Sequence, residues 1–304
     1  MKMSRLFQLI AIFLVSLSFK TNAQTSNLLK EKIQQIISTK NATVGISIIG
    51  IEGRDKISIN ASGHYPLQSV FKLHIALAVL AEIDKGNFSL KQKVQVKKQE
   101  MLPDLWSPLR DKNPNGGNFS IADLIKYSVS QSDNVACDVL IRLLGEPKKV
   151  EEYFKKNNII KDLAIQFTEE EMQSKWENMF QNWTTPDAAS ELLMKFYSNK
   201  NDLLLKKSYD FIWKTLKETN TGGDRLKGEL PKGTTVAHKT GYSGTNEEGI
   251  TAAFNDIGIV FLPSGKYYII SVFVTNSKEN NDTNAKIIAD ISKATWDFYL
   301  NQER

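Results

Sequence analysis

The segment Gln68–Leu80, which reads QSVFKLHIALAVL, is the most informative stretch of the sequence. It is apolar almost all round, which is typical of a helix buried in the middle of a protein. Ser69 and Lys72 stand three positions apart in its first turn and so share a helix face. A desolvated lysine can activate a serine hydroxyl, and the N-terminal end of a helix favours developing negative charge. This segment therefore predicts a serine nucleophile at the start of a central helix.

The first 23 residues have the pattern of a secretory signal peptide. Lys2 and Arg5 precede the apolar run 6–18, and the small residue Ala23 ends the segment. The run is shorter than the roughly 20 apolar residues that a membrane-spanning helix needs. We therefore expect export to the periplasm, cleavage after Ala23 and no membrane anchor in the mature protein.

The composition of the 304 residues, 41% hydrophobic and 24% charged, is that of a globular protein with a large core. Three of the 39 basic residues and none of the 34 acidic residues fall in residues 1–23, which leaves the mature chain with a net charge of +2. That balance argues against a nucleic-acid partner. The single cysteine, Cys137, cannot form an internal disulfide, and its apolar helical surroundings favour a core residue over a thiol nucleophile.

Strand patterns occur at both ends of the chain and helical patterns between them. Residues 87–219 are expected to be mostly helical, with 113–118 as a loop. Helices are expected at 26–37 and 283–300, and strands at 43–50, 56–60, 234–240, 256–262 and 267–275.

The simplest assembly of these elements is an α/β (α+β) fold. One antiparallel five-stranded sheet, flanked by the N- and C-terminal helices, would carry an inserted all-helical lobe. We expect residues 24–60 and 220–304 to form the sheet lobe, residues 61–219 to form the helical lobe, and the active site to lie between them.

Two further motifs follow the Ser-x-x-Lys pair. Ser132-Asp133-Asn134 lies between two predicted helices, where short polar side chains usually serve as caps. Lys239-Thr240-Gly241 ends a predicted strand, and by itself it is only a charged strand end before a glycine. A Ser-x-x-Lys match is expected about once by chance in a chain of this length. In this order, however, the three motifs form the signature of class A β-lactamases and penicillin-binding proteins.

The resemblance extends over essentially the whole mature chain. The segments QSVFK at 68–72, YSVSQSDNVAC at 127–137, QNWT at 181–184 and AHKTG at 237–241 resemble the extended-spectrum, cephalosporinase-type branch of class A β-lactamases. This implies a β-lactamase/transpeptidase-like fold and a monomeric periplasmic hydrolase of β-lactam antibiotics, with no metal and no cofactor. The three histidines of the chain have no metal-ligand spacing, and we interpret them as structural.

The resemblance also implies the catalytic roles. Ser69 would attack the lactam carbonyl, Lys72 would maintain the proton network around it, and Ser132 would pass a proton to the leaving nitrogen. The backbone N–H groups of Ser69 and Tyr242 would form the oxyanion hole.

Substrate binding is implied for a second group of residues. Asn134 would bind the acylamide side chain of the substrate, while Lys239 and Thr240 would hold its carboxylate. Trp106 resembles the aromatic wall of the site, although a partly exposed core tryptophan is an equal alternative. Arg225 resembles the arginine behind the Lys-Thr-Gly strand, and the alternative is an exposed, unpaired arginine.

The deacylating base is expected in the loop 167–173, which reads FTEEEMQ. The family pattern there is Glu-x-x-Leu-Asn, and aligning Met172 with the leucine selects Glu169 as the base. Gln173 then stands in place of the asparagine. A solvated surface loop is the alternative interpretation of a glutamate run.

Two rival functions share the three motifs. One is a penicillin-binding D-Ala-D-Ala peptidase, which lacks the glutamate loop and usually carries an anchor or an extra domain. The other is a β-lactam receptor that stays acylated and is tethered to a membrane signalling segment. The glutamate loop and the expected absence of an anchor favour the hydrolase.

Overall fold

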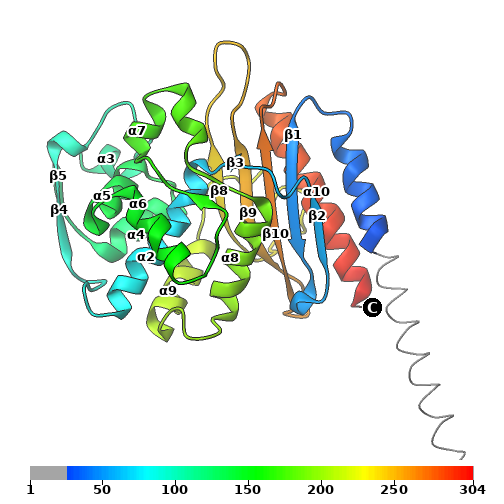
Figure 1. Ribbon diagram of the computed structural model, residues 1–304, viewed down its shortest axis with the longest axis horizontal. Helices are drawn as coiled ribbons and strands as arrows, with labels where there is room; N and C mark the ends of the chain where they lie inside the picture. Colours follow the sequence, from blue (N-terminus) through cyan, green and yellow to red (C-terminus); the bar gives the residue numbers. More distant parts are fainter. Residues whose placement is uncertain (1–25, 304) are drawn as a thin grey trace, which may run out of the picture.

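The computed structural model describes residues 26–303, and its centre is a five-stranded sheet (Figure 1). The predicted signal peptide and its cleavage site lie outside the described residues. The strands are β1 (Thr43–Ile49), β2 (Lys56–Ile59), β8 (Val236–Tyr242), β9 (Phe254–Phe261) and β10 (Tyr267–Thr275). They pair antiparallel in the order β2-β1-β10-β9-β8. The predicted antiparallel sheet, built from both ends of the chain, is confirmed.

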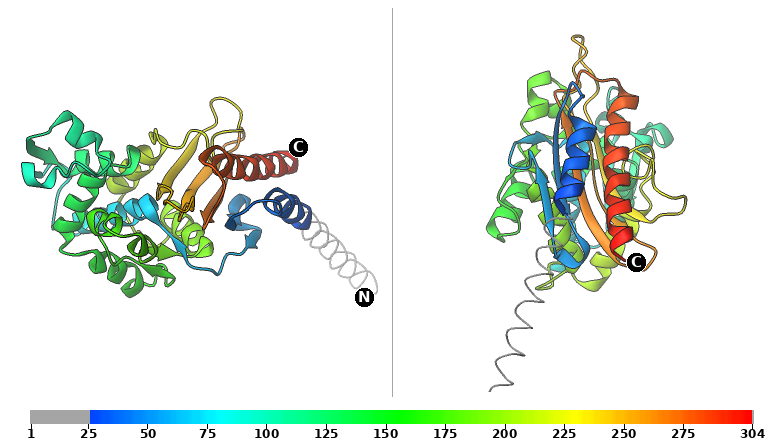
Figure 2. Two further views of the ribbon diagram at one scale, coloured as in Figure 1. Left: turned by 90° about the horizontal axis from the view of Figure 1, so that it is seen from above. Right: turned by 90° about the vertical axis from the view of Figure 1, so that its right-hand side faces the viewer.

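Helices cover both faces of this sheet. The helix at residues 26–37 and α10 (Asn281–Gln302) lie side by side on one face (Figure 2). On the other face, α8 (Pro186–Ser198) packs on β1 and β10, where the Ser190 hydroxyl donates to the Ser47 carbonyl over 3.0 Å. Because both faces are covered, β1 and β10 are buried almost along their whole length, as their apolar sequences require.

The central helix of the helix-rich half is α2 (Phe71–Asp84), which follows a 3-10 turn at Gln68–Val70. Every side chain from Phe71 to Ala81 is buried, as its all-round apolar sequence predicts. The surrounding helices are α3 (Pro108–Lys112), α4 (Ile121–Ser130), α5 (Asn134–Leu144), α6 (Pro147–Lys156), α7 (Glu169–Gln173) and α9 (Lys206–Lys217).

The helix-rich half also contains short strands, so the expectation that it is all helical needs correction. β4 (Lys93–Lys97) pairs with β5 (Gly116–Ser120), and β7 (Trp183–Thr184) pairs with β3 (Tyr65–Pro66) and β6 (Leu163–Ala164). The expected loop at 113–118 is therefore wrong at its C-terminal end. The physical reason is that β4 alternates exposed and buried residues, and β5 pairs along it.

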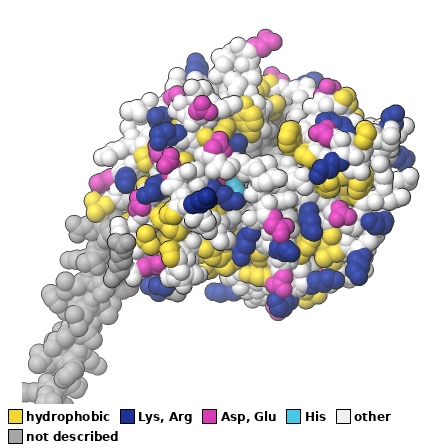
Figure 3. Space-filling view, turned by 180° about the vertical axis from the view of Figure 1, so that it is seen from behind, with side chains coloured by type: hydrophobic (Ala, Val, Ile, Leu, Met, Phe, Trp, Pro, Cys, Tyr) yellow, Lys and Arg dark blue, Asp and Glu magenta, His cyan; other side chains and the backbone are white. Residues whose placement is uncertain are grey.

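Charged side chains on the surface are mixed in sign. On the face shown in Figure 3, basic and acidic side chains are interspersed, in line with the near-balanced charge of residues 24–304. Within residues 26–303, no helix combines the length and the apolar character that a membrane crossing requires.

Candidate active site

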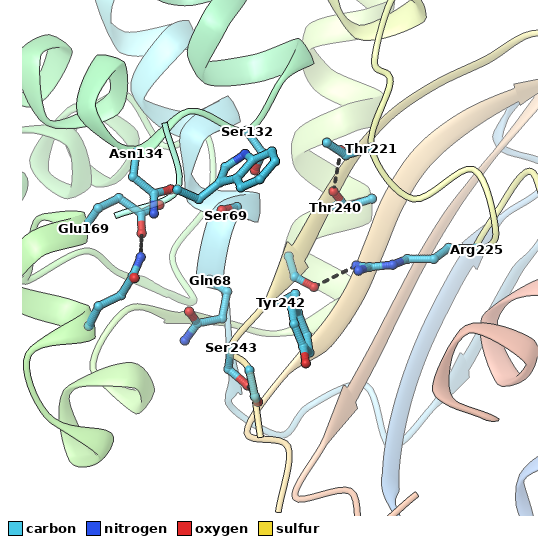
Figure 4. Close-up of a pocket in the computed structure, with 14 residues that line it drawn as sticks. Gln68, Ser69, Ser132, Asn134, Glu169, Thr221, Arg225, Thr240, Tyr242 and Ser243 are labelled. Atoms are coloured by element: carbon cyan, nitrogen blue, oxygen red, sulfur yellow. Dashed lines mark hydrogen bonds between the residues drawn. The ribbon is translucent and has the colours of Figure 1, made fainter. Parts of the chain in front are cut away.

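A pocket of about 360 Å³ opens where the start of α2, the α4–α5 junction, α7 and the end of β8 meet. Figure 4 shows that its lining includes Ser69, Ser132, Thr240 and Glu169. The structure thus brings residues of all three sequence motifs and of the glutamate loop to one cavity.

Lys72 links the nucleophile to the glutamate loop. Its ammonium group is fully buried and donates to Ser69 Oγ at 2.6 Å and to Asn134 Oδ1 at 2.8 Å. Its third hydrogen bond goes to Glu169 Oε1, with which it forms an ion pair. Three acceptors therefore match the three N–H groups of a protonated lysine, which is how a buried charge is tolerated.

Asp133 explains why its two neighbours point into the pocket. Its carboxylate accepts from the N–H groups of Ala136, at the start of α5, and of Leu109, at the start of α3, at 2.8 and 2.6 Å. Burial raises the pKa of Asp133, while these N–H donors oppose the rise. Asp133 is thus the expected cap, and it fixes a turn in which Ser132 takes a left-handed φ of 58° and Asn134 begins α5.

Glu169 is the one member of the glutamate run that turns inward. Its side chain is 1% exposed, whereas Glu170 and Glu171 are exposed to solvent. Gln173, one turn later in α7, donates its amide N–H to Glu169 Oε2 at 2.9 Å. Each carboxylate oxygen of Glu169 therefore accepts a hydrogen bond, one from Gln173 in the pocket lining and one from the buried Lys72.

Lys239 belongs to the opposite wall. It is fully buried in β8 and donates to Ser132 Oγ and to the Thr240 carbonyl, each at 2.9 Å. Burial, and next the nearby charge of Lys72, lowers the pKa of Lys239 well below the usual lysine value. An anion bound here would favour the charged form of Lys239.

Gly241 lets the two walls approach each other. A Cβ atom at this position would stand 2.6 Å from the carbonyl oxygen of Leu67, which is too close for any side chain. The end of β8 therefore rests directly on the backbone that leads into Ser69.

Arg225 supports the same strand from behind. Its Nη1 atom donates to the carbonyls of Gly241 and Asn255, each at 2.8 Å, so that it joins β8 to β9. The guanidinium lies over the Phe254 ring at 3.8 Å from the centroid, and burial lowers its pKa. The exposed, unpaired alternative considered for Arg225 is wrong.

Two aromatic residues form the rim. Trp106 is 60% exposed, and its Nε1 donates to the Gln131 carbonyl at 3.1 Å. Tyr242, 42% exposed, accepts a hydrogen bond from the Asn281 side chain at 3.1 Å. Trp106 is therefore an exposed wall of the pocket rather than part of the core.

Comparison with known proteins agrees with this geometry. A family model described as the beta-lactamase enzyme family matches residues 27–299. The chain belongs to this family. It is similar to beta-lactamase VEB-1 of Pseudomonas aeruginosa, at 49% identity over 96% of this chain and 98% of that protein. It is also similar to the extended-spectrum beta-lactamase PER-1 of the same organism, at 42% identity over 94% of this chain and 91% of that protein.

Solved structures give the same result. The crystal structure of the TLA-1 extended-spectrum beta-lactamase is 50% identical to this chain and superposes with a TM-score of 0.87, covering 90% of this chain and 98% of that one. The architecture of this β-lactamase is therefore that of experimentally determined members.

Sequence reasoning missed several residues of the β-lactamase site. The pocket lining also contains Gln68, Thr221, Ser243 and Gly244. Gln68, Ser243 and Gly244 stand within three positions of Ser69 or Gly241 in the sequence, so their closeness to a motif could have indicated that they line the pocket. Thr221 had no such signal, because tertiary structure brings it to the pocket.

Asp138 was missed as well. Its carboxylate accepts from the backbone N–H groups of Glu169 at 2.7 Å and Glu170 at 3.1 Å, so it holds the start of α7. Burial, and next the charge of Glu169, raises the pKa of Asp138 to about 7. Asp138 stands four residues after Asn134 and therefore on the same face of α5. This spacing could have indicated from the sequence that Asp138 lies near the site.

Proposed function

We propose that this β-lactamase hydrolyses its substrates through a covalent ester on Ser69, with the residue roles given below. The observation that carries the proposal is that Lys72 hydrogen-bonds both the Ser69 hydroxyl and the Glu169 carboxylate at the wall of one pocket. A nucleophile and a carboxylate base are therefore both hydrogen-bonded to one lysine, which links their proton sites.

In acylation, Ser69 Oγ bonds to the lactam carbonyl carbon and the carbon–nitrogen bond of the ring breaks. The serine proton enters the hydrogen-bond network that Lys72 forms with Ser69, Asn134 and Glu169. It returns to Ser132 once Ser132 has protonated the leaving nitrogen, so Glu169 is a free carboxylate before deacylation. The N–H groups of Ser69 and Tyr242 stabilise the oxyanion. Ser132, held by Lys239 at 2.9 Å, delivers a proton to the leaving nitrogen.

Substrate orientation is the task of the other side chains. Lys239 and Thr240 bind the substrate carboxylate as charge-assisted donors on β8. Asn134 binds the acylamide group, Trp106 covers the mouth of the pocket, and Arg225 keeps the end of β8 in place through the Gly241 carbonyl.

In deacylation, Glu169 removes a proton from a water that attacks the ester. The glutamate is buried beside Ser69, and Gln173 fixes its second oxygen from the same helix. Because Glu170 and Glu171 are exposed, they are not assigned to this step.

The proposal also covers the lobes, the cellular location and the substrate range of the enzyme. Residues 24–60 and 220–304 form a sheet lobe, 61–219 form a helical lobe, and the site lies between them. The enzyme acts as a periplasmic monomer after cleavage behind Ala23. The similarity to the extended-spectrum beta-lactamase PER-1 supports an extended-spectrum substrate range.

The test is to mix the purified protein with a chromogenic cephalosporin. Steady turnover of many equivalents supports the hydrolase. Colour from only one equivalent of cephalosporin per protein, followed by a stable adduct, would instead indicate a receptor or a peptidase. Ser69→Ala is the matched control, because it removes the nucleophile while leaving Lys72 and Glu169 in place, and activity should fall about 10⁴-fold or more. A covalent adduct on that variant would assign the nucleophile to another residue.

A further inference from the structure

Thr221 makes a contact that has no part in the proposed acylation and deacylation steps. It lies on the short segment after α9, lines the pocket, and has its hydroxyl oxygen 2.8 Å from that of Thr240 (Figure 4). Thr240 itself is only 4% exposed. Two hydroxyl groups at this distance share a single proton between them, so one must donate and the other must accept.

The segment around Thr221 is held from both lobes. The Thr219 hydroxyl donates to the His238 carbonyl of β8 at 2.9 Å, and the Asn220 N–H donates to the Ser130 carbonyl at the end of α4 at 3.1 Å. On the other side, Gly222 has a left-handed φ of 65°, and a Cβ there would stand 2.5 Å from Thr240 Cγ2. The position of the Thr221 hydroxyl relative to Thr240 is therefore imposed by the fold.

The direction of the shared hydrogen bond depends on the ligand. Either threonine can be the donor of the bond between them. When a carboxylate lies beside Lys239 and Thr240, the Thr240 proton makes a stronger, charge-assisted bond to the anion. Thr240 then needs a donor for its own oxygen, and Thr221 is placed to supply it. Linked hydroxyl groups polarise each other, so this chain strengthens the contact to the anion.

We propose that Thr221 is a positioning residue that donates to Thr240 and so directs the Thr240 proton toward the substrate carboxylate. The inference rests on the proposed role of Thr240 as a carboxylate-binding residue. It makes Thr221 a determinant of preference for anionic over neutral β-lactams, although it does not touch the anion itself.

The main test is Thr221→Val, which keeps the shape of the side chain and removes the hydroxyl. We expect kcat/KM for a carboxylate-bearing cephalosporin to fall about 3- to 10-fold, the usual range for one lost hydrogen bond, mainly through KM. For the methyl ester of the same cephalosporin, which lacks the anion, the change should be less than about 2-fold. Thr221→Ser keeps the hydroxyl and should restore the wild-type ratio of acid to ester.

A matched control comes from a second hydroxyl pair. Thr245 and Thr251 are also 2.8 Å apart, but neither belongs to the lining of the pocket. Thr245→Val should leave the ratio of acid to ester unchanged. Thermal unfolding of each variant reports whether the fold is intact.

A double-mutant cycle separates positioning from a merely structural role. In a Thr240→Val background, Thr221→Val should have no further effect, because the group that it orients is gone. Equal losses on acid and ester, or losses that add in that background, would overturn the proposal. If the wild-type protein itself shows no turnover, the proposed function fails, and that result is distinct from a normal wild type with an unaltered Thr221 variant.

Discussion

The two sides of the pocket differ in how their buried cations are paired. We call the side that contains Lys72 and Glu169 the helical wall, and the side that contains Lys239 and Arg225 the strand wall. On the helical wall, the buried Lys72 is paired with the buried Glu169. On the strand wall, the hydrogen bonds of Lys239 go to a hydroxyl and a carbonyl, and those of Arg225 go to two carbonyls. Among residues 26–303, no carboxylate forms an ion pair with either of these two cations.

This difference matches two different tasks. A balanced pair can pass protons between its members while its net charge stays near zero, which suits bond making and breaking. A buried cation without a counter-ion is costly, and an incoming anion reduces that cost. The helical wall is therefore expected to control the rates of the chemical steps, and the strand wall to control which substrates enter.

The largest expected effect is on the helical wall. Glu169→Gln keeps the shape of the side chain but removes the base. The variant should acylate and then stall, with deacylation slowed by about 10²–10⁴. Intact-protein mass spectrometry after brief mixing with a cephalosporin should show a long-lived adduct.

Glu170→Gln is the matched control for this variant. Its side chain is exposed next to Glu169 in α7, so its turnover should stay near normal. If the Glu170 variant stalled while the Glu169 variant turned over freely, the base would be Glu170 instead of Glu169.

The next effect belongs to the strand wall. Lys239→Ala should lower kcat/KM for carboxylate-bearing lactams by roughly 2–4 kcal/mol of transition-state binding, because a charge-assisted contact in a desolvated site is lost. Steady-state kinetics measure this loss, and mass spectrometry should show no accumulating adduct. Unchanged kinetics would exclude Lys239 from the site, and an accumulating adduct would contradict the division of tasks between the walls.

His74 shows another consequence of burial, one that concerns stability. His74, two residues after Lys72 in α2, has its pKa lowered to about 4 by burial. The unfolded chain, with an ordinary histidine pKa near 6.5, binds the proton more tightly. The stability from this group is therefore complete above pH 6.5 and is lost as the pH falls toward 4.

Between pH 7 and pH 5 the loss from His74 amounts to about 2 kcal/mol of unfolding free energy. His74→Leu should reduce the pH dependence of urea unfolding by that amount. His64→Gln changes an exposed histidine and should keep the wild-type dependence. An unchanged pH dependence in His74→Leu would show that this histidine is not neutral in the folded protein.

The smallest effect is expected from the support behind β8. Arg225→Ala removes two hydrogen bonds to backbone carbonyls but no contact with the substrate. The loss of transition-state stabilisation, measured from kcat/KM, should therefore be about 1 kcal/mol. A loss as large as that of Lys239→Ala would mean that Arg225 binds the anion directly. The melting temperature should be measured in parallel, because the side chain is buried.

The inward direction of Glu169 was predictable from local pattern. Met172 is an apolar residue in a polar run, and it is buried in the structure. Residue 169 lies three positions before it on a helix and therefore faces the same way. The pairing of Gln173 with Glu169, four residues apart, follows from the same helical spacing.

Contacts between distant segments could not be predicted in this way. The bond between Thr221 and Thr240 joins the end of α9 to β8, and that between Asp138 and Glu169 joins α5 to α7. Both depend on how whole elements pack. The strand β5 was missed for a related reason, because its two glycines disfavour a strand until β4 lies beside them.

The close approach at Gly241 has a consequence for the evolution of antibiotic range. No side chain fits between this position and the Leu67 carbonyl, so the floor beside the nucleophile is closed to mutation. Tyr242, the next residue, is exposed at the rim, where its side chain meets no comparable backbone contact. At this end of β8, we therefore expect changes in antibiotic range to arise at the mouth of the pocket rather than at Gly241.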